Sequence, residues 1–181
     1  AAAIAGGSVK VLGVGDRALQ GDAAFIEVLE SMGCTTRTTD RSLEVTSSGS
    51  LHGIEIDMAD MSDLVPTLAV VAAFADSPTR ITGVGFIRHK ESDRIGDLVN
   101  GLKMVGCDAV EEDDGILIRP VHESQMHGAE LLTHDDHRLA MAWSLLALRI
   151  SGIVIDDPEV VSKSWPEWWD VRSSLLVVAA K

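Results

Sequence analysis

The chain is poor in the residues that build disulfide frameworks and metal centres. It has only two cysteines among 181 residues, Cys34 and Cys107. They form no CxxC pair, and no histidine stands near them in metal-ligand spacing. The sequence therefore predicts neither a disulfide framework nor a zinc site, and we expect two buried free thiols and no bound metal.

Positive charge is also scarce. Fifteen Lys and Arg residues stand against 28 Asp and Glu residues, which gives a net charge of -13 at pH 7 and a pI near 4.7. Nucleic acids and anionic membranes attract net basic surfaces, so neither is expected as a general partner. An anionic ligand would have to be bound by a local cluster of basic residues.

Long apolar runs are missing as well. No run reaches the roughly 18 residues needed to span a bilayer, and the apolar start AAAIAGG lacks the basic residues of a signal peptide. With 46% hydrophobic and 24% charged residues, the composition is typical of a soluble globular protein. We expect a cytoplasmic location.

The sequence repeats itself with a period of about seventy residues. Residues 9–34, VKVLGVGDRALQGDAAFIEVLESMGC, and residues 79–107, TRITGVGFIRHKESDRIGDLVNGLKMVGC, share a strand, a GVG turn, a loop and a helix that ends in Gly-Cys. The offset is 70 between Gly13 and Gly83 but 73 between Cys34 and Cys107, so the second copy has three additional residues. This insertion lies in the region of HKESDR.

Two strongly apolar segments, residues 63–75 and 137–149, align at an offset of 74. They are apolar nearly all round, which predicts helices buried at the centre of a domain. Polar hairpins are predicted at RTTDRSLEVTS and VEEDDGILIRP. Because such units bury their central helices only by packing together, residues 1–181 are expected to form one domain.

The start of the chain aligns with the end of one of these buried helices. The chain also lacks an initiator methionine. We therefore expect a fragment of a longer protein whose N-terminal portion is absent.

Five basic residues lie at junctions that lead into helices: Arg88, Lys90, Arg94, Arg138 and Lys163. Helix N-termini offer unpaired N–H groups and a favourable dipole for anions, and a nearby cation adds full charge. Because pseudo-symmetry would bring these junctions to one end of the domain, the sequence predicts a local cationic site on an acidic protein.

Two carboxylates near these junctions allow more than one interpretation. Asp63 could cap a helix, a role that stabilises by roughly 1 kcal/mol. Glu91 could be a first-turn residue or the partner of Arg94 in an i,i+3 salt bridge. Asp93 is interpreted as the N-terminal residue of the next helix, and His89 has no assigned role.

Three segments, HKESDR, DDHRLAM and VVSKSWP, resemble signatures of the 5-enolpyruvylshikimate-3-phosphate synthase family in order and spacing. The similarity covers the whole chain and fits the C-terminal part of that family. It implies an α+β fold of pseudo-threefold βαβαββ repeats around buried helices, in an enzyme with two domains and a substrate cleft between them. The implied reaction joins the enolpyruvyl group of phosphoenolpyruvate to the 5-hydroxyl of shikimate 3-phosphate in aromatic amino-acid biosynthesis, without a cofactor.

The resemblance also implies roles in the chemistry. Asp63 would bind the shikimate hydroxyl and accept its proton, and Glu91 would exchange a proton with the methylene carbon of phosphoenolpyruvate. Lys163 would act near the leaving phosphate. His137 is included beside the site, with a less defined role.

The implied substrate contacts are mostly basic. Arg94 and Arg138 resemble the guanidinium pair that holds phosphoenolpyruvate, a task that suits a planar fork of donors. Lys90 resembles a lysine that contacts the shikimate substrate. Asp63 and Lys163 complete the implied substrate-binding set.

Some positions depart from the family pattern. Phe86 stands where many members carry a polar residue, and Ser164-Trp165 replaces a more usual Thr-Phe. Substrate contacts from the N-terminal portion are absent, so the 181 residues alone are expected to be catalytically inert. Two alternatives remain: UDP-N-acetylglucosamine enolpyruvyltransferase, and a non-catalytic binding or assembly domain with the same fold.

Overall fold

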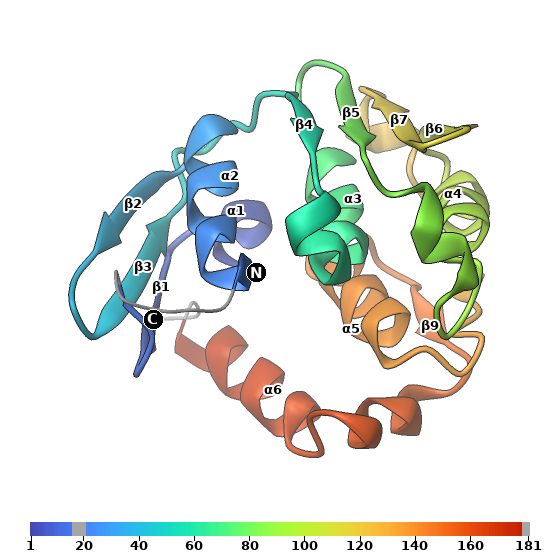
Figure 1. Ribbon diagram of the computed structural model, residues 1–181. Coiled ribbons are helices and arrows are strands. Elements are labelled where there is room, and N and C mark those ends of the chain that lie inside the picture. Colours follow the sequence, from blue (N-terminus) through green and yellow to red (C-terminus); the bar gives the residue numbers. More distant parts are fainter. Residues whose placement is uncertain (16–20, 179–181) are drawn as a thin grey trace.

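The computed structural model describes residues 1–15 and 21–178, which form short strands and helices in alternation (Figure 1). Part of the loop expected in the first repeat, residues 16–20, lies outside this description. The α-helices are α1 Ala2–Ala5, α2 Phe25–Ser31, α3 Val65–Ala72, α4 Arg94–Met104, α5 His137–Leu146 and α6 Trp168–Val178. Short 3-10 helices are η1 Gly21–Ala24, η2 Ala59–Leu64, η3 Gly85–His89, η4 Glu123–Gln125 and η5 Pro158–Lys163.

The strands belong to three separate sheets. The strands are β1 Ser8–Leu12, β2 Thr35–Thr38, β3 Ser42–Thr46, β4 Glu55–Asp57, β5 Thr79–Thr82, β6 Asp108–Glu112, β7 Gly115–Arg119, β8 Glu130–Leu131 and β9 Val154–Ile155. The sheet orders are β1-β3-β2, β4-β5-β7-β6 and β8-β9. β4 pairs with β5 in parallel, and β8 pairs with β9 in the same way. The two predicted hairpins are confirmed as the antiparallel pairs β2–β3 and β6–β7.

The predicted repeat is visible in the order of the elements. The middle copy runs β4, α3, β5, α4, β6, β7, which is the βαβαββ unit. The first copy follows the same order from α1 to β3, and the last follows it from β8 to α6. The predicted α+β fold, built from repeated units, is confirmed.

The predicted apolar helices lie in the core. In α3 every residue except Thr67 is buried, and in α5 the indole of Trp143 is completely buried. These two helices pack side by side (Figure 1). One continuous cluster of buried residues joins α1, α3 and α5 with the inner faces of the sheets, from Ala3 to Ile150. Each large aliphatic side chain buried there contributes about 1.5–3 kcal/mol, so the central helices hold the repeats together.

The remaining predictions concern the thiols, the membrane and metals. Cys34 and Cys107 are both free and buried, as expected, and burial raises the pKa of Cys107 to about 11. Within residues 1–15 and 21–178, no helix combines the length and apolar character needed to cross a bilayer. In the same part of the chain, no group of three or more His, Cys, Asp or Glu residues is placed to hold a metal ion.

Candidate functional site

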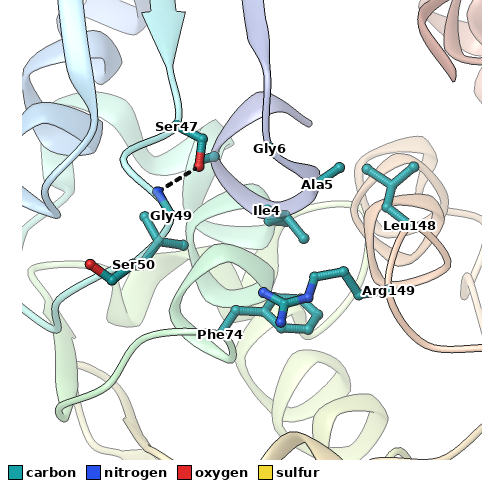
Figure 2. Close-up of a pocket in the computed structure, with 11 residues that line it drawn as sticks. Ile4, Ala5, Gly6, Ser47, Gly49, Ser50, Phe74, Leu148 and Arg149 are labelled. Atoms are coloured by element: carbon teal, nitrogen blue, oxygen red, sulfur yellow. Dashed lines mark hydrogen bonds between the residues drawn. The ribbon is translucent and has the colours of Figure 1, made fainter. Parts of the chain in front are cut away.

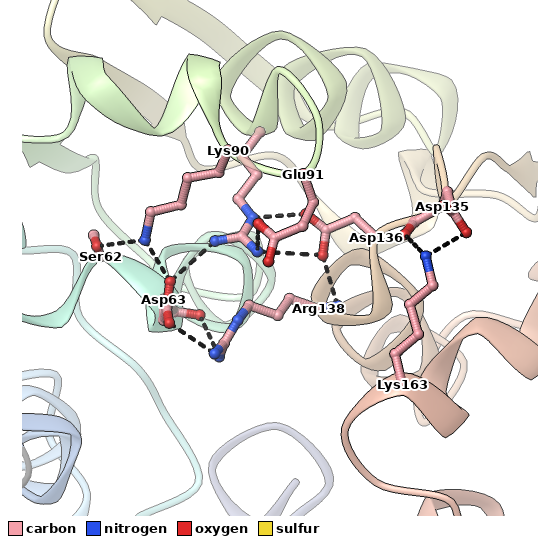
Figure 3. A network of polar contacts seen from close by, with 9 residues as sticks. Ser62, Asp63, Lys90, Glu91, Asp135, Asp136, Arg138 and Lys163 are labelled. Carbon is pink, nitrogen blue, oxygen red and sulfur yellow. Dashed lines mark hydrogen bonds and ion pairs between the residues drawn. The ribbon is translucent and has the colours of Figure 1, made fainter.

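Asp63 lies at the centre of a polar network at the N-terminal ends of α3 and α5 (Figure 3). Its Oδ1 accepts from Lys90 Nζ at 2.5 Å and from Arg94 Nη1 at 3.1 Å, and its Oδ2 accepts from Arg138 Nη2 at 2.7 Å. The helix that follows has Leu64 at its N-cap and no side-chain cap hydrogen bond. The capping interpretation of Asp63 is therefore wrong, because its carboxylate faces three cations instead.

The three cations control the ionisation of Asp63. Burial alone would raise the pKa of this carboxyl group. The hydrogen bond from Lys90 and the charges of Arg138 and Lys90, together with the hydrogen bond from Arg94, outweigh burial and hold the pKa below its ordinary value. Asp63 is therefore ionised at neutral pH while these partners surround it.

Arg94 is the first residue of α4, and its side chain is completely buried. Its Nε donates to Asp136 Oδ2 at 2.6 Å, and its Nη2 donates to Glu91 Oε2 at 2.6 Å. The predicted i,i+3 pair with Glu91 is thus confirmed. Burial alone would lower the pKa of Arg94. The hydrogen bond to Asp136 and the negative charges of Asp136 and Glu91 outweigh burial and raise this pKa. A guanidinium without such partners would be very costly to bury.

Arg138 and His137 form the first turn of α5, which Asp136 caps by accepting from the Arg138 backbone N–H at 2.8 Å. The guanidinium of Arg138 donates to the carboxylate of Asp63. Its Nη1 also donates to the backbone oxygen of Asp63, at 3.3 Å. Among the described residues, Arg138 Nε and His137 Nδ1 are buried without a hydrogen-bond partner. Burial lowers the pKa of His137. The charge of Asp136 opposes this shift and the charge of Arg138 adds to it, so the imidazole is neutral at neutral pH.

Lys90 follows η3, in the loop that carries the three-residue insertion. Besides Asp63, its ammonium group donates to Ser62 Oγ at 3.0 Å. It also lies 5.7 Å from the centre of the half-exposed Phe86 ring, within the range of a cation–π contact. Phe86, the departure from the family pattern, therefore lies next to the network.

Lys163, at the end of η5, lies at the edge of the same region (Figure 3). Its Nζ is 2.6 Å from Asp135 Oδ1 and donates to the Asp135 backbone oxygen at 3.0 Å. The residue next to Asp135 is Asp136, which binds Arg94. Lys163 is thus connected to the network through two adjacent aspartates.

Direct contacts join five of the predicted site residues: Asp63, Lys90, Glu91, Arg94 and Arg138. Lys163 is linked to them through Asp135 and Asp136, and His137 lies next to Arg138 in the first turn of α5. Sequence reasoning missed the roles of Asp135 and Asp136, although the two acidic residues stand directly before His137 in DDHRLAM. Arg88 does not belong to the site, because its guanidinium binds Glu111 and Asp93 beside the β6–β7 hairpin. Asp93 caps α4 as predicted, accepting from the Gly96 N–H at 3.1 Å.

A separate cavity of about 330 Å³ lies at the opposite, C-terminal ends of the central helices (Figure 2). Its lining includes Gly6, Phe74 and Arg149, and the Arg149 guanidinium lies 5.0 Å from the centre of the Phe74 ring. None of the predicted site residues lines this cavity. The polar network and the cavity are therefore distinct regions of the molecule.

Solved structures with the same architecture define the class of protein. An EPSP synthase from Acinetobacter baumannii has a TM-score of 0.83 and 32% identity, over 96% of this chain and 43% of that one. The enolpyruvyl transferase NikO from Streptomyces tendae has a TM-score of 0.71, over 91% of this chain and 37% of that one, and at 21% identity it shows the fold alone. The fold is that of the enolpyruvyl transferases.

Sequence comparison identifies the family within this class. The model of the family described as EPSP synthase (3-phosphoshikimate 1-carboxyvinyltransferase) matches residues 1–171. The 3-phosphoshikimate 1-carboxyvinyltransferase of Methanosphaerula palustris is 45% identical over 174 residues, which cover 96% of this chain and 40% of that protein. The chain belongs to the EPSP synthase family, and it spans about two-fifths of the length of the curated relatives it matches.

Proposed function

We propose that residues 1–181 form one domain of a two-domain enzyme and supply half of its active site. The reaction transfers the enolpyruvyl group of phosphoenolpyruvate to the 5-hydroxyl of shikimate 3-phosphate, and the other half of the cleft comes from an N-terminal portion. One observation carries the proposal: basic groups from η3–α4 and from α5 converge on Asp63 at the N-terminus of α3, although Arg138 and Asp63 are 75 residues apart.

In this proposal the cations bind the two anionic substrates. Arg94 and Arg138 hold phosphoenolpyruvate, Lys90 contacts the shikimate substrate, and Lys163 lies near the phosphate that leaves. Guanidinium groups suit carboxylates and phosphates because their planar donors bind two oxygens at once. Each cation already has a carboxylate partner, so an arriving anion competes with Asp63, Glu91 or Asp135 rather than entering an uncompensated positive site.

The carboxylates move the protons. The 5-hydroxyl attacks C2 of phosphoenolpyruvate and loses its proton to Asp63, while Glu91 protonates the methylene carbon to give a tetrahedral adduct. The adduct then expels phosphate, which leaves with the proton held by Asp63. A proton of the new methyl group returns to Glu91 and the enolpyruvyl ether forms, so Asp63 is again ionised and Glu91 again protonated. Asp63 suits the role of base because it is ionised, and its pKa rises as substrate anions draw the cations away. His137, neutral in this environment, can exchange hydrogen bonds without adding charge.

A chimaera tests this function. The matching segment of the Methanosphaerula palustris relative is replaced by this chain, and phosphate release is measured with both substrates. Release should require phosphoenolpyruvate and shikimate 3-phosphate together, and Asp63→Asn and Glu91→Gln should each lower kcat by about a hundredfold or more, since positioned acids and bases contribute that much. Glu55→Gln, an exposed change on β4, should leave kcat unchanged.

The isolated chain and an alternative acceptor serve as further controls. We expect no phosphate release by the 181 residues alone, because they span about two-fifths of the length of these relatives and the proposed cleft needs a second half. Turnover by the isolated chain would contradict the shared cleft. Turnover of the chimaera with UDP-N-acetylglucosamine, but not with shikimate 3-phosphate, would contradict the proposed substrate.

A further inference from the structure

The loop before α5 contains two adjacent residues in an unusual backbone conformation. His134 and Asp135 have φ values of 49° and 61°, and they are the non-glycine residues of the described chain with positive φ. L-residues other than glycine adopt this left-handed region at an energetic cost, and such residues gather at functional sites. The cost implies that the surrounding contacts hold this turn in place.

Three successive side chains of this turn contact two other elements, α4 and η5. His134 Nε2 lies 3.3 Å from Asp97 Oδ1 on α4. Asp135 holds Lys163 at the end of η5, and Asp136 holds Arg94 at the start of α4. The turn therefore links the positions of two basic groups, Lys163 and Arg94, through adjacent aspartates.

The side chains of Asp135 and Asp136 differ in their exposure to solvent. The Asp136 side chain is completely buried and is fixed by both Arg94 and the α5 backbone. The Asp135 side chain is 77% exposed, and its partner Lys163 is 47% exposed. An exposed ion pair is weak and exchanges readily, whereas Lys163 also keeps a second anchor at the Asp135 backbone oxygen.

We propose that Asp135 is a positioning residue that acts as the resident counter-ion of Lys163 and competes with the phosphate group of the substrate for it. The proposal rests on the proposed function, in which Lys163 meets that phosphate. Without a ligand, the Asp135 carboxylate directs the ammonium group towards the α5 end of the site. A bound phosphate takes over the ammonium group, and Asp135 recovers it when phosphate leaves. Asp135 thereby weakens anion binding and favours release.

The test measures Kd for phosphoenolpyruvate and for inorganic phosphate by calorimetric titration of the chimaera, which contains the rest of the proposed cleft. Asp135→Asn removes the charge, and asparagine tolerates the left-handed conformation. Asp135→Gly also removes the charge, and glycine adopts this conformation without strain. Both variants should bind each anion about two- to fivefold more tightly, the range expected for loss of one exposed competing ion pair. Glu55→Gln removes the same charge from exposed β4 and corrects for the change in net charge.

A second arm separates competition from a general structural effect. In a Lys163→Met background, Asp135→Asn should no longer change either Kd, because the contested cation is gone. Unchanged or weaker binding by Asp135→Asn, with the unsubstituted chimaera binding both anions, would overturn the competition and leave the proposed function standing. Failure of the unsubstituted chimaera and of every variant to bind either anion would overturn the proposed function and this inference with it.

Discussion

At the scale of single residues, the site is organised by Arg94. This side chain is completely buried, and its nitrogens donate to three carboxylates, those of Asp63, Glu91 and Asp136. Removing one partner of a buried charge usually costs about 3–5 kcal/mol, since the other charge is left without compensation. Arg94 therefore stabilises the fold only together with its partners, and the same partners fix its position as an anion-binding group.

His137 gives a pH dependence at this scale. Its folded-state pKa lies below the unfolded value, because burial disfavours the imidazolium. The unfolded chain consequently binds more protons as the pH falls below about 6.5, and the stability contributed by neutral His137 is complete above that pH and lost as the pH falls through the folded-state pKa. The wild-type chain should lose more unfolding free energy than His137→Gln between about pH 7.5 and about pH 5.5.

Urea titrations of both proteins at the two pH values measure this difference. The other five histidines are common to both proteins, so their titration cancels in the comparison. Equal losses in wild type and variant would mean that His137 accepts its proton as easily in the folded chain as in the unfolded chain.

At the scale of elements, the position of α4 depends on a close contact with α5. A Cβ atom added at Gly101 would lie 2.6 Å from Cζ2 of Trp143, whose indole is completely buried and donates to the Leu132 backbone oxygen at 3.1 Å. Its burial and this hydrogen bond oppose a shift of the indole. The glycine thus allows α4, and with it Arg94, to approach α5 and Asp136.

Gly101→Ala tests this packing. Alanine favours a helix over glycine by up to about 1 kcal/mol, but forcing a methyl group into a packed interior typically costs about 1–3 kcal/mol. The clash should prevail, and the unfolding free energy should fall. Asn100→Ala, on the exposed face of the same helix, should be neutral or slightly stabilising in the same urea titration. A gain in stability for Gly101→Ala would contradict the close packing.

Much of the element-level architecture was predictable because its signals are local. The apolar segments 63–75 and 137–149 gave the buried helices α3 and α5, and the Asp-Asp-Gly turn gave the β6–β7 hairpin. Four of the five basic junction residues, Lys90, Arg94, Arg138 and Lys163, lie in or beside the polar network, since repeated units place their junctions at one end. Arg88 does not, because it binds Glu111 and Asp93. The pairing of Asp135 with Lys163 was not predictable, because it depends on tertiary packing across 28 residues. The choice between a cap and a site residue for Asp63 likewise depended on tertiary contacts, those with Lys90, Arg94 and Arg138.

At the scale of the whole molecule, a strongly acidic chain contains a site whose charges balance. The network pairs Lys90, Arg94 and Arg138 with carboxylates from three separate segments, whereas the chain as a whole carries a net charge of -13. The excess negative charge opposes the approach of anions in general. Binding of a polyanionic substrate therefore depends on this local group of cations and on the half of the cleft that other residues supply.

Titration of phosphoenolpyruvate into the chimaera measures whether these converging cations form the binding site for this compound. Saturable binding is expected for the unsubstituted chimaera, and Arg138→Gln should weaken it about tenfold or more, the loss expected for a charge-assisted pair of hydrogen bonds. Arg37→Gln, on exposed β2, removes the same charge and should leave the Kd unchanged. Equal weakening by both variants, or no binding by the unsubstituted chimaera, would show that these cations do not form the site.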